Sequence, residues 1–257
     1  MDEFILPIDR TKFSSTNSAW NDLMLNDPWS VGYVSTLIEL HPWKNKEEWE
    51  NFYFQSGEER NKLLANNKEL LNDYSLPLKD KNKICNLDWS LKNLNTQYGR
   101  TVDDLKQKAQ TLYNATKDNG HNLTIEDCYE CVRFRVICET WNGIILRENN
   151  TIEKLKSIFP KHIFKKTSGE IDHTYAVDYE VYLSDKLICG LQIKPKSYLW
   201  STPYIRKARS ANKLKNNAYT RQKGVPVFDI IASNKGDIYN SEALNVIVSA
   251  KRYHHSA

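Results

Sequence analysis

The sequence lacks any long hydrophobic run. No apolar stretch approaches the ~20 residues that a membrane-spanning helix needs. The first ten residues, MDEFILPIDR, also lack the basic segment followed by an apolar segment that marks a secretory signal. We therefore expect a cytoplasmic protein.

Cysteine is scarce, and its number is odd. Five cysteines among 257 residues suit a reducing compartment better than a framework of disulfides. Cys128 and Cys131 form a CxxC pair of the kind found in zinc sites, but no second CxxC and no H-x₃₋₅-H pair follows. Cys138 extends the pair at helical spacing, so all three fall on one face of a predicted helix. We favour burial in the core over a zinc site.

The composition is that of an ordinary globular protein, and its charge is unevenly distributed. Apolar residues make up 40% and charged residues 26%, which excludes a disordered or fibrous chain. The net charge is only +4, yet the segment from Lys186 to Phe228 holds ten Lys or Arg residues and no Asp or Glu. This segment favours an anionic partner, although a solvated basic face is the simpler alternative.

The first half of the chain is predicted to be mainly helical. The helical patterns cover residues 18–25, 31–40, 46–66, 101–117 and 124–148. The sequences TVDD and TIED at the start of the last two are typical of helix N-termini. Tryptophans 20, 29, 43, 49 and 89 are spread over this half, and we expect them to pack in the core. We divide the chain into a helical N-terminal region, 1–123, and a core, 124–257.

After Pro160 the pattern becomes that of strands. The segments HIFKKTSGEIDHTY, AVDYEVYL and KLICGLQIKP alternate and are rich in β-branched and aromatic residues. The segment SYLWSTPYIRKARSANKLKNNAYTRQ follows as loop plus helix, and VPVFDIIAS as a buried strand. This order predicts an α/β (α+β) core, in which a mixed sheet is flanked by helices.

The second and third of these strands are predicted to form an amphipathic hairpin. Alternation puts one apolar set on each strand: Val177, Tyr179, Val181 and Leu183 on the first, and Leu187, Cys189, Leu191 and Ile193 on the second. The two sets share a face only if opposed residue numbers sum to an even value. A three-residue connection, Ser184-Asp185-Lys186, supplies the sum of 370, whereas a two-residue turn does not.

The other face of the hairpin gathers polar groups. In this register Asp178 lies opposite Gln192, with Lys194 as its diagonal neighbour, and opposed side chains are ~5 Å apart at Cβ. Gly190 lies opposite Glu180, which predicts room for a ligand beside the cluster. The alternative is a polar face that is simply solvated. Two features count against this alternative: the mixture of carboxylate, amide and ammonium groups, and the basic segment that follows directly.

The spacing of Asp178 and Gln192-Ile193-Lys194 resembles the catalytic motif of PD-(D/E)xK nucleases. The longer string QIKPKSY resembles the IKPxTY of the MjaI-like type II restriction endonucleases. A second stretch, VGYVSTLIELHPWKNKEEWENFY, resembles that family's VGxLSxLIxxFP segment, the EEW after it and an aromatic-Tyr pair. With the helix VICETW before the strands, the resemblance spans roughly residues 30 to 200.

The resemblance implies Mg²⁺-dependent cleavage of double-stranded DNA at a short palindromic sequence by a homodimer. It implies catalytic roles for Asp178, Gln192, Lys194 and Glu139. The metal would be held by Asp178, Gln192, the backbone carbonyl of Ile193 and Glu139. Residues 1–123 would then make dimer contacts or embrace the duplex. The candidate DNA-binding residues are Lys196, Arg206, Lys207, Arg209, Lys213, Lys215 and Arg221.

The sequence departs from the commonest family pattern at one ligand position. Gln192 offers an amide oxygen but no charge, so the negative charge must come from Asp178 and from Glu139 or Glu180. Val177 also stands where the motif has proline. Two alternatives follow: a DNA-binding protein on a degenerate nuclease core, and a nuclease of the same core that acts on branched DNA or RNA.

Overall fold

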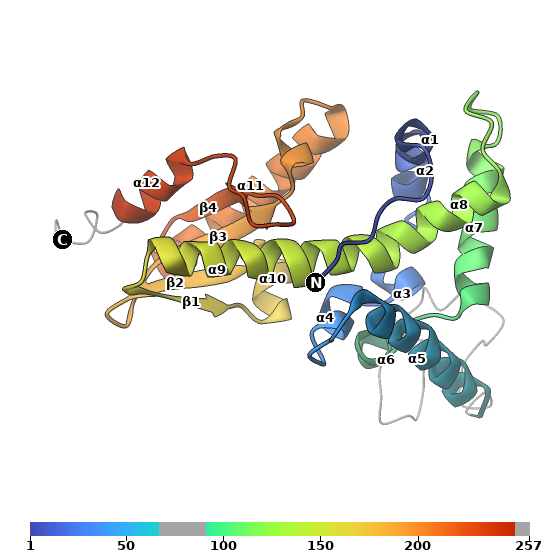
Figure 1. Ribbon diagram of the computed structural model, residues 1–257, viewed down its shortest axis with the longest axis horizontal. Coiled ribbons are helices and arrows are strands. Elements are labelled where there is room, and N and C mark those ends of the chain that lie inside the picture. The colour runs from blue at the N-terminus through green and yellow to red at the C-terminus, as the bar shows by residue number, and fades with distance from the viewer. Residues whose placement is uncertain (67–90, 250–257) are drawn as a thin grey trace. The chain divides into compact units, whose positions relative to one another are not determined.

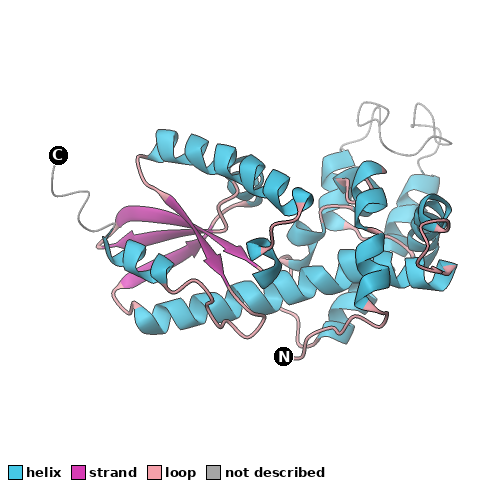
Figure 2. Cartoon of the chain, turned by 90° about the horizontal axis from the view of Figure 1, so that it is seen from above, coloured by secondary structure: helices cyan, strands magenta, loops and turns pink. Residues whose placement is uncertain are grey.

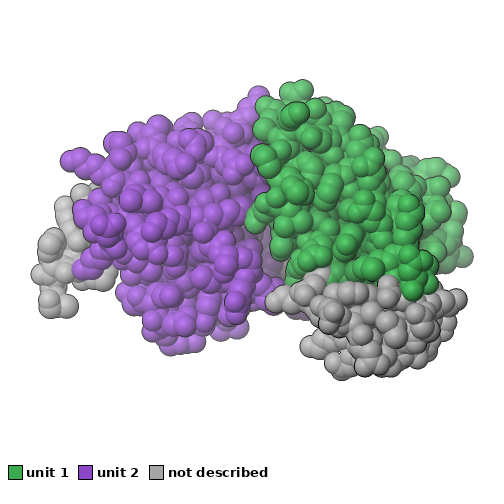
Figure 3. All heavy atoms as spheres, turned by 90° about the horizontal axis from the view of Figure 1, so that it is seen from below, with its two compact units in different colours: residues 1–142 green, residues 143–257 purple. Residues whose placement is uncertain are grey.

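The computed structural model describes residues 1–66 and 91–249, which form two compact units. The units are Met1–Asn142 and Gly143–Ala257 (Figure 3). The boundary between 123 and 124 stays a prediction about domains. Cys85 and Trp89 lie outside the described residues. None of the described helices has both the length and the hydropathy required to cross a membrane.

The first unit is built from helices (Figure 1). Their bounds are α1 Arg10–Ser15, α2 Asn17–Asp22, α3 Pro28–Val31, α4 Val34–Ile38, α5 Lys46–Asn66, α6 Leu91–Gln97, α7 Val102–Thr116, α8 Ile125–Arg133 and the π-helix η2 Phe134–Cys138. The predicted helix 46–66 is confirmed as α5. The single helix predicted over 31–40 is wrong, because Gly32 has a φ of +86° and separates α3 from α4.

Capping and burial explain the helices of this unit. Thr101 and Thr124 each accept a hydrogen bond from the backbone N–H three residues later, and Asp104 and Asp127 return one, so TVDD and TIED are both capping boxes. Among the tryptophans predicted to be core, Trp20, Trp43 and Trp49 are buried.

The three helical cysteines are core residues, as predicted. Cys128, Cys131 and Cys138 are buried and unpaired. Burial raises the pKa of the Cys128 thiol to about 11. Desolvation therefore keeps these thiols neutral, which is typical of packing rather than of metal binding.

The second unit carries a four-stranded sheet in the order β1-β2-β3-β4. Its elements are β1 His162–Lys166, α10 Gly169–Tyr175, β2 Tyr179–Leu183, β3 Lys186–Lys194, the 3₁₀ helix η4 Lys196–Leu199, α11 Pro203–Lys223, β4 Val227–Ile231 and α12 Glu242–Ser249, preceded by α9 Asn149–Ile158. The π-helix η3, Trp141–Glu148, spans the division between the units. β1, β2 and β3 are antiparallel, and β3 and β4 are parallel. The predicted α+β class with a mixed sheet is confirmed.

Helices cover both faces of this sheet (Figure 2). On one face, Leu155 of α9 and Ile247 of α12 pack in the same cluster as the strand residues Val181 and Leu191. On the other face, Tyr219 of α11 packs against Val177, with Tyr175 of α10 beside them. The polar face of the hairpin is therefore the face that α10 and α11 adjoin.

The segment 162–175 is only partly a strand. β1 ends at Lys166, and α10 begins after Ser168, whose side chain accepts a hydrogen bond from the backbone N–H of Ile171. The expectation of a strand over the whole segment is wrong from Gly169 onward. The N-cap serine and the acidic residues of the first turn explain the helix.

The hairpin turn also differs from the prediction. β2 and β3 are joined by two residues, Ser184 and Asp185, both with positive φ as the type I′ turn requires. A β-bulge then adds Ile188, so that Tyr182 pairs with Leu187 while Val181 pairs with Cys189. Next to the two-residue turn the numbers of paired residues sum to 369, and beyond the bulge they sum to the predicted 370.

The bulge changes which face Leu187 joins. Ile188 and Cys189 both pack in the α9 and α12 cluster, whereas Leu187 packs with Val177 and Tyr219 on the other face. The predicted placement of Val177 and Leu187 is therefore wrong. From Cys189 to Lys194, however, the alternation of β3 is as predicted.

Candidate functional site

Asp178 lies directly before β2, and its carboxylate reaches the backbone of β3 next to Gln192. The backbone N–H of Asp178 donates to the carbonyl of Leu191 at 2.8 Å, one residue before the Tyr179–Leu191 pair. Oδ2 of Asp178 accepts a 2.6 Å hydrogen bond from the backbone N–H of Ile193. β2 begins at Tyr179, so the carboxylate takes the place of a backbone carbonyl at this position. Asp178 is thus held against the backbone between Gln192 and Lys194.

Gln192 is buried and its amide oxygen is unsatisfied. The residue is 1% exposed, and Oε1 has no hydrogen-bond partner among the described residues. A buried polar atom left without a partner costs about 1–3 kcal/mol and is uncommon in native proteins. Such an atom indicates that something else, a water or an ion, completes the site.

Asp229 adjoins this cluster, and the sequence analysis missed it. It lies on β4, directly paired with Gln192 in the parallel ladder. Its Oδ1 is a second buried oxygen without a partner among the described residues. The sequence does contain a signal for Asp229. The segment VPVFDIIAS is predicted to be a buried strand, and an aspartate in the middle of a buried strand is unusual.

The electrostatics of Asp229 place it among the predicted site residues. Burial raises the pKa of this carboxyl above its ordinary value, Lys194 lowers it, Asp178 raises it and Arg209 lowers it. Each influence requires proximity, because Coulomb interactions fall with distance. The structure therefore brings together Asp178, Gln192, Lys194 and Asp229.

Lys194 is half-buried at the end of β3, where it pairs with Ile231 of β4. Within residues 1–66 and 91–249 its ammonium group forms no hydrogen bond or ion pair. A cation that remains available beside a buried carboxylate can interact with a substrate phosphate.

Glu180 does not join the cluster as an available carboxylate. Its Oε1 accepts a 2.5 Å hydrogen bond from the hydroxyl of Tyr219, and its Oε2 accepts one of 2.6 Å from Tyr182. Both oxygens are therefore already used. The hydrogen bond to Glu180 is the main reason why the pKa of Tyr182 is raised to about 12.

Gly190 does not provide room for a ligand, and that expectation is wrong. It pairs with Glu180 as predicted. However, a Cβ at this position would meet Val177 Cγ1 at 2.9 Å, Val227 Cγ2 at 3.3 Å and Tyr219 Cε1 at 3.5 Å. The space is filled by these side chains, and glycine lets them pack closely on the sheet.

Glu139 lies in the first unit, directly after η2. Its side chain is exposed, and it interacts electrostatically with Arg135 and Cys138. Asp178, Gln192 and Lys194 belong to the second unit. The role predicted for Glu139 stays a prediction.

The candidate DNA-binding residues divide into exposed and anchored groups. Except for Lys196, all of them lie on α11. The α11 residues among them with exposed side chains are Arg206, Lys207, Lys213 and Arg221, and Lys196 is exposed as well. Residues seven or fourteen apart fall close together around a helix, so these four share one side of α11, away from the buried Tyr219.

The other three cations contact the protein itself. The guanidinium of Arg209 donates to the backbone carbonyls of Tyr198 and Trp200 and so fixes η4 against α11. Lys215 Nζ donates to the carbonyl of His173 in α10 at 2.6 Å. Lys196 Nζ lies 5.1 Å from the ring centroid of Tyr239. Arg209 and Lys215 therefore have structural contacts that a purely DNA-binding role does not require.

The cluster fits a hard divalent cation. Asp178, Gln192 and Asp229 present oxygen atoms, the donor type that Mg²⁺ and Ca²⁺ prefer. The unsatisfied Gln192 Oε1 and Asp229 Oδ1 are the observation that supports this fit. Across the described part of the chain, no group of three or more His, Cys, Asp or Glu side chains is placed to hold a metal. The donor set of this cluster is instead two carboxylates and an amide oxygen.

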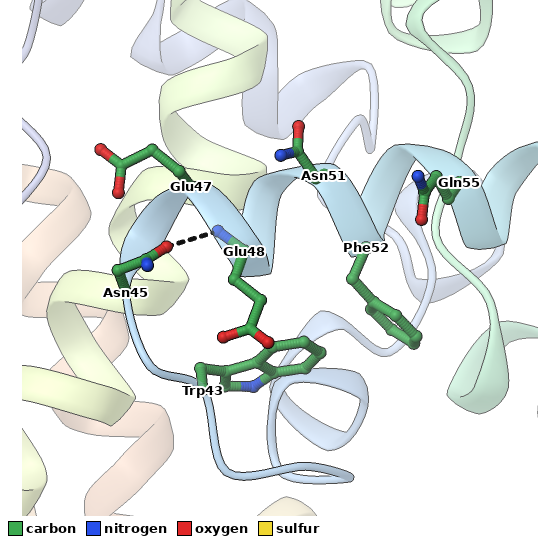
Figure 4. Close-up of a pocket in the computed structure, with 7 residues that line it drawn as sticks. All are labelled: Trp43, Asn45, Glu47, Glu48, Asn51, Phe52 and Gln55. Carbon is green, nitrogen blue, oxygen red and sulfur yellow. Dashed lines mark hydrogen bonds between the residues drawn. The ribbon is translucent and has the colours of Figure 1, made fainter.

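A separate hollow lies in the first unit beside the start of α5 (Figure 4). The rings of Trp43 and Phe52, with centroids 5.0 Å apart, form part of its lining. Glu48 Oε2 accepts from the backbone N–H of Lys44, and Asn45 Oδ1 accepts from that of Glu48. These bonds cap the start of α5 and engage the side chains of Glu48 and Asn45.

Comparison with known proteins gives one family match. The family model described as MjaI restriction endonuclease matches residues 16–225. This range includes Asp178, Gln192 and Lys194 and ends before Asp229. No curated protein and no solved structure matches the chain.

Proposed function

This chain belongs to the MjaI restriction endonuclease family and is a site-specific deoxyribonuclease, and on that premise we propose that Asp178, Gln192 and Lys194 form its cutting site, with Mg²⁺ as cofactor. The proposed target is a short palindrome in double-stranded DNA, and the proposed location of the enzyme is the cytoplasm. We propose a homodimer, because the two-fold symmetry of a dimer would match that of a palindromic target.

The observation that carries this proposal is the buried, unsatisfied Oε1 of Gln192, next to the residue whose backbone N–H fixes the carboxylate of Asp178. An oriented carboxylate beside an amide oxygen without a partner forms part of a cation site. A solvated polar face would not bury Gln192 to 1% exposure.

Each residue then has a chemical role. Asp178 and Gln192, with the backbone carbonyl of Ile193, hold the ion. The ion supplies Lewis-acid polarisation of the scissile phosphate when it is bound. Lys194 Nζ donates a hydrogen bond to a phosphate oxygen or to the attacking water, and its charge offsets the negative charge that develops on the phosphate. Glu139 is proposed as a further carboxylate on the basis of the family resemblance.

Binding is proposed to use the exposed side of α11. Arg206, Lys207, Lys213 and Arg221 would contact phosphates or base edges, and Lys196 is a further candidate. Arg209 and Lys215 are proposed to support this surface and to add positive charge near it. The helical region 1–123 is proposed to embrace the duplex or to form dimer contacts.

Digestion of a plasmid of known sequence tests the proposal. Purified protein is incubated with supercoiled and linear DNA in Mg²⁺ and, in parallel, in EDTA. We expect discrete fragments in Mg²⁺ only, with ends that map to one palindromic sequence. Cleavage in EDTA would contradict metal dependence, and fragments with no common end sequence would contradict the palindromic target.

A further inference from the structure

We propose that Asp229 of β4 is a metal-binding carboxylate, which supplies the negative charge that Gln192 lacks. The inference rests on the proposed function, because it adds a residue to the same cation site. The family match ends at residue 225, so the role of Asp229 is inferred from its position in the sheet and not from the family.

The register of the sheet places Asp229 at the site. Gln192 pairs with Asp229 across the parallel β3–β4 ladder. Oδ2 of Asp178 accepts a hydrogen bond from the backbone N–H of Ile193, the residue directly after Gln192. Paired residues on neighbouring strands point to the same face. Gln192 and Asp229 therefore point to one face, and Asp178 lies beside them, since its carboxylate bonds to Ile193 and interacts electrostatically with Asp229. Asp178, Gln192 and Asp229 together form a row of oxygen donors.

The hydrogen-bonding state of the row indicates a missing ligand. Oε1 of Gln192 and Oδ1 of Asp229 are both buried, and neither has a partner among the described residues. These two oxygens, which belong to paired residues, are both acceptors, so neither can satisfy the other. A cation between them satisfies both at once.

The charge of the row points to the same conclusion. No ion pair to Asp229 is formed within the described residues, because Arg209, which lies near it, directs its guanidinium to the carbonyls of Tyr198 and Trp200. Lys194 also lies near Asp229 but forms no ion pair with it in this part of the chain, and a carboxylate with a buried oxygen left without a partner is costly unless a cation completes it. Asp178 and Asp229 together provide the two negative charges that a divalent ion requires.

The carboxylate of Glu180, on the same hairpin, is already engaged. Both oxygens of Glu180 accept hydrogen bonds from tyrosine hydroxyls. Asp229 thus has an available oxygen that Glu180 does not have.

Mn²⁺ binding to the full-length protein tests the proposal without relying on cleavage. Bound Mn²⁺ is measured by calorimetric titration and by loss of the free-ion EPR signal. We expect Asp229→Asn, which keeps the side-chain shape, to weaken Mn²⁺ binding at least about tenfold. The control Asp185→Asn changes an exposed carboxylate of the hairpin turn at a positive φ, which asparagine tolerates, and should bind as wild type does.

Thermal unfolding separates a ligand from a structural residue. Mn²⁺ should raise the Tm of the wild type, because an ion that binds only the folded state stabilises it. Asp229→Asn should lose this rise while keeping a cooperative transition in EDTA. Should Asp229→Asn bind Mn²⁺ and gain Tm as the wild type does, the inference is overturned, and the cutting site of Asp178, Gln192 and Lys194 still stands.

A charge exchange adds a test that holds even if the single variant folds poorly. The double variant Gln192→Glu with Asp229→Asn moves the carboxylate to the paired strand and keeps the total charge. We expect it to regain Mn²⁺ binding to within about tenfold of wild type. If the double variant folds but binds no Mn²⁺, the idea that the two positions share one ion is wrong. A wild-type protein that binds no Mn²⁺ would overturn this inference and the proposed site together.

Discussion

The carboxylate of Asp178 accepts a 2.6 Å hydrogen bond from the backbone N–H of Ile193, the residue between Gln192 and Lys194. This bond fixes the carboxylate of one strand against the motif backbone of the next. It uses one oxygen, Oδ2, for orientation. Because a charged acceptor makes a strong hydrogen bond, the site is arranged before any substrate binds.

Two substitutions at Asp178 should separate orientation from charge. Asp178→Asn retains an oxygen that can accept from Ile193 but removes the charge, so it should abolish cleavage with little loss of stability. Asp178→Ala leaves that buried N–H without a partner and should lower the free energy of unfolding by about 1–3 kcal/mol. Urea unfolding and plasmid cleavage measure the two effects. Equal stability of the two variants would contradict the structural role of the hydrogen bond.

Lys194→Ala should abolish cleavage and leave DNA binding nearly unchanged. Its ammonium group acts on the reacting phosphate, whereas the exposed cations of α11 dominate binding. Cleavage rate and duplex affinity are measured on the same preparation. The control Lys186→Ala removes an exposed cation at the far end of β3 and should cut normally. Wild-type cleavage by Lys194→Ala would exclude the catalytic role.

The exposed side of α11 should set the salt dependence of DNA binding. Each phosphate contact contributes about 0.9 to the slope of log affinity against log salt. Replacement of Arg206 and Lys213 by Gln should therefore reduce the slope by up to about 2. The measurement is duplex binding in EDTA at several salt concentrations. A slope equal to that of wild type would remove these two residues from the interface.

Gly190→Ala should destabilise the second unit. The added Cβ would lie 2.9 Å from Val177 Cγ1, and a buried site that is overfilled in this way costs about 1–3 kcal/mol. Gly143→Ala is the control, because its Cβ would meet only the Arg147 side chain, at 3.7 Å. In the helical η3, alanine should be neutral or stabilising. Urea unfolding compares them, and equal stability would show that Val177 and Tyr219 can yield to the added group.

The hairpin shows which features the alternation of apolar residues predicts and which it does not. Alternation from Cys189 to Lys194, combined with the apolar set of β2, predicts the pairs from Val181–Cys189 to Tyr179–Leu191, and the structure has them. β2 begins only at Tyr179, so the predicted pair of Asp178 with Gln192 lies beyond its end. The same pattern does not determine how the strands are joined. A two-residue turn plus a bulge at Ile188 gives the same register as a three-residue connection, so the choice depends on the twist of the strands and on packing against α9, α12 and α11.

By itself, the sequence determined the mixed α+β order, the capped helices α7 and α8, and the residues of β2 and β3 that share a polar face. These properties follow from periodicity and from hydrogen bonds within a few residues. Only the tertiary structure decided that Asp229 lies beside Gln192 and that Glu180 accepts hydrogen bonds from Tyr182 and Tyr219. It also decided that neighbouring side chains fill the space beside Gly190. The pairing of β3 with β4 and the packing of α11 bring together residues more than thirty positions apart, and no local pattern in the chain encodes that contact.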